Sequence, residues 1–168
     1  MRWSTKQLSL MALLTAIALA IHVAEAQIPA PVPIPGVKLG LANIVTVYAM
    51  FSLGPGPALM ILVARILLGS FFAGQIVSLL YSLAGGLLCY VVMLLLRRML
   101  TKKQIWAASV LGAIAHNIGQ ILVAVIVTGT PAIVSYLPIL LLSGIAAGLF
   151  TGLAAQYLVN RMDKKSRE

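Results

Sequence analysis

Apolar runs separated by short polar or proline- and glycine-rich segments repeat along the whole chain. Each run is close to the ~20 residues with which an α-helix crosses the hydrocarbon core of a bilayer. The pattern predicts six membrane-spanning helices, at residues 7–26, 37–53, 55–72, 74–97, 104–128 and 137–160. The second and third runs are short and are separated only by SLGPGP, so re-entrant segments are an alternative there. We therefore predict one all-α transmembrane domain over residues 1–168.

Composition places the chain in the membrane class independently of that pattern. Of its 168 residues, 61% are hydrophobic and only 9% are charged, and the mean hydropathy is +1.07. A soluble domain of this size needs a far more polar surface. The single cysteine, Cys89, lies in an apolar run and excludes both a disulfide framework and a multi-cysteine metal site.

The basic residues indicate how the chain is oriented. Lysine and arginine are enriched in cytoplasmic loops, and clusters beside apolar runs mark that side. We therefore predict that the N terminus, the C terminus and the loop after the fourth helix are all cytoplasmic. Six membrane crossings are consistent with these three placements. The net charge of +9 then indicates contact with anionic membrane lipid and not with nucleic acid. The clusters contain ten of the twelve basic residues: Arg2 and Lys6; Arg97, Arg98, Lys102 and Lys103; Arg161, Lys164, Lys165 and Arg167.

The first apolar run has two interpretations. Residues 24–26 read AEA before Gln27, which resembles the A-x-A pattern of a signal-peptide cleavage site. The run from 8 to 24, however, is interrupted only by small polar residues and His22, and with its flanks it is long enough to span a membrane. We favour a retained helix, because its regularly spaced alanines suit close helix packing.

Helical phase divides this first helix into two faces. At 100° per residue, His22 and Glu25 lie about 140–160° from the centre of the alanine stripe. An acid exposed to lipid is costly, so the polar face should point into the bundle and the alanine face outward. The stripe could serve packing within this chain or docking to a partner membrane subunit. Its members are Ala12, Ala16, Ala20 and Ala24.

Polar residues from several predicted helices fall at one depth, in the outer half of the membrane. With a rise of about 1.5 Å per residue, they gather beneath Lys38 and the proline-rich segment 29–35. The shared depth predicts a ligand pocket that opens to the outside. Cationic groups outnumber the one acid there, which favours a ligand with an anionic group. The candidate binding residues are His22, Glu25, Lys38, Asn43, Arg65, Tyr81, His116, Asn117 and Gln120.

Each of these residues also has a structural explanation. Glu25 and Arg65 could form an ion pair with each other, since a buried charge needs a partner. The amides and His116 could hydrogen-bond neighbouring helices. His22 and Glu25, three residues apart, are too few ligands to predict a metal site.

Several enzyme classes are excluded by what the sequence lacks. The only acids are Glu25, Asp163 and Glu168, so no carboxylate pair can hold Mg²⁺ on a diphosphate. No G-x-x-x-x-G-K-[ST] motif occurs, so the chain does not hydrolyse ATP itself. We predict a protein that is not an enzyme and needs no cofactor.

Three segments carry a resemblance to a known family. "IPGVKLGLANIVTVYAMFSLGP", the helix of Arg65 and "GAIAHNIGQI" resemble the Gx transporter family, also named heptaprenyl diphosphate synthase component I. Together with the alanine repeat, they are similar to the substrate-binding S-component of energy-coupling factor (ECF) transporters. The resemblance implies a six-helix bundle in the bacterial cell membrane that binds a vitamin-like micronutrient near its outer face, under a lid formed by the first outer loop. It also implies that Ala12, Ala16 and Ala20 dock on a transmembrane coupling subunit that carries two cytoplasmic ATPases.

The second family name suggests a different role. The chain has no aspartate-rich motif, so it cannot be the catalytic prenyltransferase. The alternative is a non-catalytic accessory membrane subunit linked to heptaprenyl diphosphate, quinone or redox metabolism. A purely structural anchor is a third interpretation.

Overall fold

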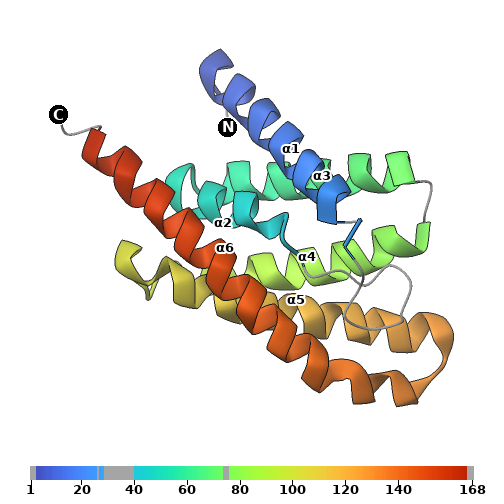
Figure 1. Ribbon diagram of the computed structural model, residues 1–168. Helices are drawn as coiled ribbons and strands as arrows, with labels where there is room; N and C mark the ends of the chain where they lie inside the picture. The colour runs from blue at the N-terminus through green and yellow to red at the C-terminus, as the bar shows by residue number, and fades with distance from the viewer. Residues whose placement is uncertain (1–2, 26, 29–39, 74–75, 166–168) are drawn as a thin grey trace.

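The computed structural model describes residues 3–25, 27–28, 40–73 and 76–165, and every regular element in these ranges is helical (Figure 1). Most predicted helix boundaries agree with the structure to within a few residues, although the last helix is longer and is preceded by a 3₁₀ turn. The elements are α1 (Thr5–Glu25), α2 (Asn43–Ser52), α3 (Pro55–Ala73), α4 (Ile76–Leu96), η1 (Lys102–Gln104), α5 (Ile105–Thr128), η2 (Pro131–Tyr136) and α6 (Leu137–Lys165).

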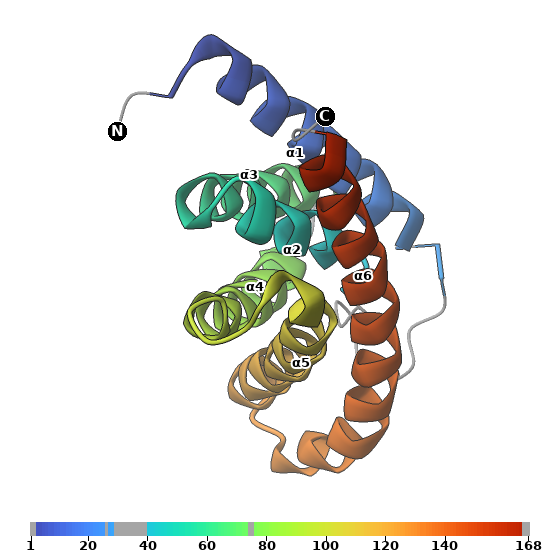
Figure 2. The ribbon, with the colours of Figure 1, turned by 90° about the vertical axis from the view of Figure 1, so that its left-hand side faces the viewer.

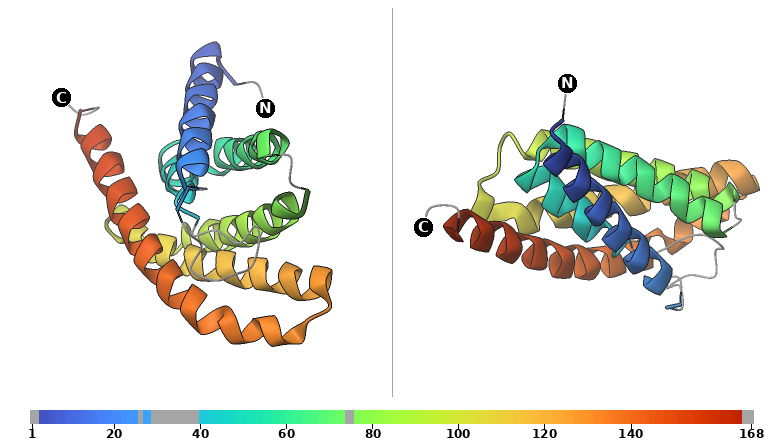
Figure 3. Two further views of the ribbon diagram at one scale, coloured as in Figure 1. Left: turned by 45° about the vertical axis from the view of Figure 1, so that its right-hand side comes forward. Right: turned by 90° about the horizontal axis from the view of Figure 1, so that it is seen from above.

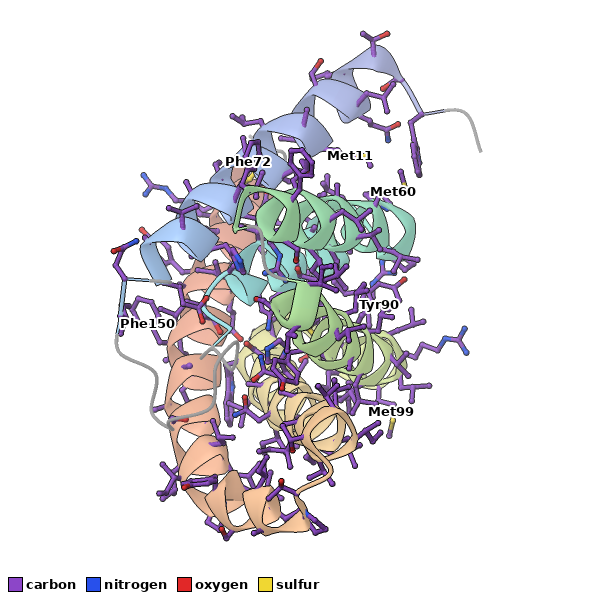
Figure 4. All side chains as sticks on the ribbon, turned by 90° about the vertical axis from the view of Figure 1, so that its right-hand side faces the viewer. Met11, Met60, Phe72, Tyr90, Met99 and Phe150 are labelled. Atoms are coloured by element: carbon purple, nitrogen blue, oxygen red, sulfur yellow. The ribbon has the colours of Figure 1, made fainter. Side chains whose placement is uncertain are left out.

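Five of the described helices are long and apolar enough to cross a membrane: α1, α3, α4, α5 and α6. Their outward surface is apolar as well. Met60, Phe72, Met99 and Phe150 are 50–79% exposed and lie on the outside of the bundle (Figure 4). Such side chains suit contact with lipid tails, so the chain is a multi-pass helical membrane protein.

The predicted second span, 37–53, is wrong in length. α2 has 10 residues and is therefore about 15 Å long, half of the ~30 Å hydrocarbon core. Gly40 has φ 81°, in the left-handed region, so the right-handed helix cannot include it. The backbone N–H of Asn43 bonds back to the Gly40 carbonyl at 2.9 Å, and the helix begins there.

Helix α5 packs very closely against α4 on one side and against α6 on the other (Figure 3). Glycines permit this approach: a Cβ on Gly148 of α6 would lie 2.8 Å from Val110 Cα of α5. A Cβ on Gly119 of α5 would lie 2.8 Å from the Ala84 carbonyl oxygen of α4. Small residues bring helices together in this way in membranes, where dispersion contacts replace the hydrophobic effect. Against these helices lie α2, which contacts all three, and α3, which contacts α4, while α1 packs on α2 and α3.

The structure confirms the helical phase predicted for α1. Ala12, Ala16, Ala20 and Ala24 are exposed. The buried residues of this helix are Met11, Leu14, Ala18, His22 and Glu25. The alanine face therefore points outward, and the two ionisable groups point into the bundle.

Candidate functional site

All eight candidate binding residues within the described ranges are buried, with exposed fractions between 1% and 7%. Lys38 and the proline-rich segment lie outside the described residues. The eight residues come from five helices: His22 and Glu25 from α1, Asn43 from α2, Arg65 from α3, Tyr81 from α4, and His116, Asn117 and Gln120 from α5. We call this set without Tyr81 the polar cluster.

Glu25 connects the end of α1 to the segment that leads into α2. Its Oε1 accepts a hydrogen bond from the Gly40 N–H at 2.5 Å, and its Oε2 lies 3.4 Å from the Ala42 nitrogen, which also donates to it. Among the described residues no salt bridge joins Glu25 to Arg65. The carboxylate is therefore held mainly by backbone amides, and the direct ion pair considered from the sequence is not formed.

Asn43 links α3 and α5 through its side-chain amide. Arg65 Nη2 donates a 3.0 Å hydrogen bond to Asn43 Oδ1. The amide nitrogen lies 3.4 Å from His116 Nδ1. A guanidinium has only donors, so it fixes which end of the amide faces it. Asn43 is thus the centre of the polar cluster, with one neighbour on each side.

Asn117 and Gln120 lie on α5, and Asn117 also binds α6. The Asn117 Nδ2 donates to the Leu140 carbonyl at 2.5 Å, an interhelical bond of the kind considered from the sequence. Four buried polar atoms in the described part of the chain have no hydrogen-bond partner. Buried polar groups are nearly always paired, so each of these atoms calls for a water or a ligand. They are Thr46 Oγ1, Arg65 Nε, Asn117 Oδ1 and Gln120 Oε1.

Tyr81 has a different environment from the other candidates. It packs in an apolar cluster with Ile121, Ala124 and Leu140. Its depth estimated from the sequence was similar to that of the polar residues, but its side chain belongs to the hydrophobic wall between α4, α5 and α6.

Glycines make room for the two histidines, a feature that the sequence analysis missed. A Cβ on Gly85 of α4 would lie 2.8 Å from His116 Nδ1. A Cβ on Gly69 of α3 would lie 3.1 Å from the His22 ring. Both imidazoles therefore lie against bare backbone of a neighbouring helix. Thr46, one helical turn after Asn43, was also missed, and only its spacing from Asn43 could have indicated it.

Beneath Asn43 the bundle is nearly closed. A cavity of about 10 Å³ continues inward from Gly40 and Asn43, which is room for roughly one water molecule. Its inner end is closed by Ser109 and Thr151, whose hydroxyls are hydrogen-bonded at 3.0 Å. In the described part of the chain tight packing therefore separates Asn43 from Ser109 and Thr151.

The fold and this cluster define a class: a multi-pass helical membrane protein with charged and amide side chains gathered inside its bundle. The chain belongs to the heptaprenyl diphosphate synthase component I family, whose family model matches residues 14–158. The match includes all of the polar cluster and most of α1 and α6. No curated protein and no solved structure shows significant similarity to the chain.

Proposed function

We propose that this protein is the substrate-binding membrane subunit of an ECF-type uptake transporter in the bacterial cell membrane, and that it is not itself an enzyme. The observation that carries the proposal is the set of three unpaired polar atoms in the polar cluster, Arg65 Nε, Asn117 Oδ1 and Gln120 Oε1. A membrane protein that only needed stability would gain nothing from burying a guanidinium with an unused donor, because such groups are expensive there.

The unpaired atoms indicate the chemistry of the ligand. Arg65 Nε is a donor and Arg65 is a cation, so it suits an anionic group such as a carboxylate or phosphate. Asn117 Oδ1 and Gln120 Oε1 are acceptors and call for N–H or O–H groups on the same ligand. Glu25 forms no direct salt bridge with Arg65 in the described residues, and its carboxylate is bonded to backbone amides instead. A small, vitamin-like compound with both an anionic group and hydrogen-bond donors fits this set.

The ligand would enter from the outer side. The tight packing beneath Asn43 leaves room for only about one water toward the cytoplasm. Residues 26–39 connect α1 to Gly40, which Glu25 binds directly at the cluster. We propose that the Glu25–Gly40 contact holds the outer end of the polar cluster in place.

Energy would come from other chains. The exposed alanines Ala12, Ala16 and Ala20 form a smooth strip along α1. Such strips allow a second transmembrane helix to approach closely. We propose that this strip docks on a transmembrane coupling subunit bound to two cytoplasmic ATPases.

The experiment that tests ligand capture is native mass spectrometry of gently purified protein. Wild type should retain a small anionic molecule, and Arg65→Ala should lose it, while Arg65→Lys should keep part of it because the charge remains. Arg98→Ala is a matched control, since it removes an exposed cation on the predicted cytoplasmic side. If Arg65→Ala is folded and retains the same molecule as wild type, the polar cluster is not the binding site.

The family description favours one alternative, a non-catalytic accessory membrane subunit linked to prenyl diphosphate, quinone or redox metabolism. Affinity purification from native membranes separates the two. Recovery of an ATPase pair with a membrane coupling subunit supports the transporter. Recovery of a soluble, aspartate-rich prenyltransferase or of a redox protein supports the accessory role.

A further inference from the structure

A second, apolar hollow lies on the outside of the bundle, away from the polar cluster. It has a volume of about 350 Å³. Helix α2 forms its floor, and α1 and α6 form its two walls, as their arrangement in Figure 2 shows. We call it the α1–α6 groove. Its lining residues are Leu10, Leu14, Ile17 and Ile21 of α1, Ile44, Val45 and Tyr48 of α2, and Leu158 and Met162 of α6.

The floor of the groove is held in place by a contact between two helices. The Tyr48 hydroxyl donates a hydrogen bond to Met162 Sδ at 2.8 Å, which ties α2 to the end of α6. Helix α2 therefore lies along the groove between the longer helices α1 and α6.

The groove has the length of one membrane leaflet. From Leu10 to Ile21 the helix rises about 17 Å. One leaflet contributes about 15 Å of hydrocarbon, half of the ~30 Å core. The groove begins near the N-terminal end of α1 and near the C-terminal end of α6, the two ends predicted to be cytoplasmic. From there it runs along α1 to Ile21, the residue before His22 of the polar cluster.

Its cytoplasmic end is positively charged. Lys6 is exposed and lies one turn before Leu10 on the same face of α1. Arg161 is exposed on α6, between the two groove residues of that helix, and its guanidinium lies 6.0 Å from the Tyr157 ring centre. The nearby Asp163 forms a salt bridge with Lys102 and so is already paired with another cation.

The size of the groove limits what can occupy it. An α-helix with side chains has a diameter of about 10–12 Å, so only one of its faces could enter a groove of 350 Å³. A single hydrocarbon chain fits. Basic sites between transmembrane helices on the cytoplasmic side bind anionic lipid head groups. The groove lies about 110° around α1 from the alanine stripe, so both surfaces can be occupied at once.

We propose that the α1–α6 groove binds an anionic phospholipid of the cytoplasmic leaflet, with one acyl chain along α2 and the phosphate near Lys6 and Arg161. The site is independent of ligand capture at the polar cluster. The bound lipid must have two parts: an acyl chain that fills the apolar groove and a negatively charged head group that binds the basic end.

The test is native mass spectrometry of the full chain in detergent, with phosphatidylglycerol or phosphatidylethanolamine added at equal concentration. We expect phosphatidylglycerol to be retained preferentially. Leu158→Trp, which fills the groove wall, should lower its retention about tenfold. Leu153→Trp is the matched control, an exposed leucine on the same helix that does not line the groove. Lys6→Ala and Arg161→Ala should each lower the preference for phosphatidylglycerol about fivefold.

Three results would overturn the proposal. Equal retention of the lipid by Leu158→Trp and Leu153→Trp would remove the groove from the binding site. Equal retention of both lipids by wild type would show that the head group is not recognised. A dimer that Leu158→Trp abolishes would assign the groove to a second copy of the chain. Ile17→Trp, on the opposite wall, repeats the test if Leu158→Trp melts at a lower temperature than the control.

Discussion

The Gly40 N–H donates a 2.5 Å hydrogen bond to the Glu25 carboxylate, across 15 residues of sequence. This bond holds Gly40, just before α2, at the level at which α1 ends. It also places Asn43 beside Arg65, to which it is hydrogen-bonded at 3.0 Å. The position of the polar cluster therefore depends on a contact between a side chain and the backbone.

Replacing Glu25 should destabilise the protein in proportion to the acceptors that are lost. Glu25→Ala leaves the Gly40 and Ala42 N–H groups without their acceptor, and we expect a loss of about 2 kcal/mol in the free energy of unfolding. Glu25→Gln keeps one oxygen and should lose less. Thermal unfolding in detergent measures both. A melting temperature of Glu25→Ala equal to that of wild type would show that the bond contributes nothing.

Asn43 offers a way to separate stability from ligand capture. Asn43→Leu removes the acceptor of Arg65 Nη2 and leaves a buried guanidinium less paired, which should cost about 3 kcal/mol. Asn43→Asp keeps an acceptor and adds a negative charge beside Arg65. We expect Asn43→Asp to remain folded but to lose the retained anionic ligand, because the charge that attracts it is neutralised.

The two readouts are thermal unfolding and native mass spectrometry on the same samples. If Asn43→Asp keeps its ligand as wild type does, Arg65 does not recognise an anionic group. If Asn43→Leu is as stable as wild type, the Arg65–Asn43 bond is not important for folding.

A substitution at Gly40 should cost more than the same substitution at another left-handed glycine. Gly40 and Gly129 both have positive φ, 81° and 64°. Alanine in this conformation costs about 1–2 kcal/mol at either position. At Gly40 the new Cβ would also lie 2.9 Å from Asn43 Nδ2, whereas nothing lies within 4 Å at Gly129. We expect Gly40→Ala to lower both stability and ligand retention, and Gly129→Ala to lower stability alone.

The comparison of the two variants by thermal unfolding and native mass spectrometry isolates crowding of the polar cluster from backbone strain. If Gly40→Ala and Gly129→Ala lose the same stability and retain the same amount of ligand, the space around Asn43 tolerates a methyl group. Only the backbone conformation would then matter.

Hydrophobic periodicity was sufficient to predict the long helices and the inward face of α1. A helix of about 20 residues has a clear length signal, and the placement of His22 and Glu25 opposite the alanines follows from 100° per residue. The short α2 could not be predicted in the same way. Residues 37–42 read as apolar as the helix that follows, but Gly40 has a left-handed backbone conformation that hydropathy does not record.

The sequence predicted which residues lie together in the polar cluster, but not which hydrogen bonds they form. Depth along each helix brought seven buried polar residues to one level. The partners of Glu25 are backbone amides, which every residue has, so no sequence pattern marks them. The place of His116 against Gly85 depends on the distance between α4 and α5, and that distance is set by packing of the whole bundle.

Bulk on the alanine stripe should prevent assembly without unfolding the protein. Ala16 is exposed on α1, so Ala16→Trp does not disturb the core, but it blocks close approach of another transmembrane helix. We expect wild type to co-purify with a membrane coupling subunit and an ATPase pair, and Ala16→Trp to lose both. Ala146→Trp is the matched control, because Ala146 is an exposed alanine on α6, outside the stripe.

Three measurements on the Ala16 and Ala146 variants complete this test: co-purification from native membranes, uptake by whole cells and thermal unfolding of the isolated chain. Docking through the stripe requires that Ala16→Trp alone loses co-purification and uptake while its melting temperature stays that of Ala146→Trp. A tryptophan cannot fit where two helix backbones approach closely. Retention of the ATPase pair by Ala16→Trp would therefore mean that coupling occurs through another face of the bundle.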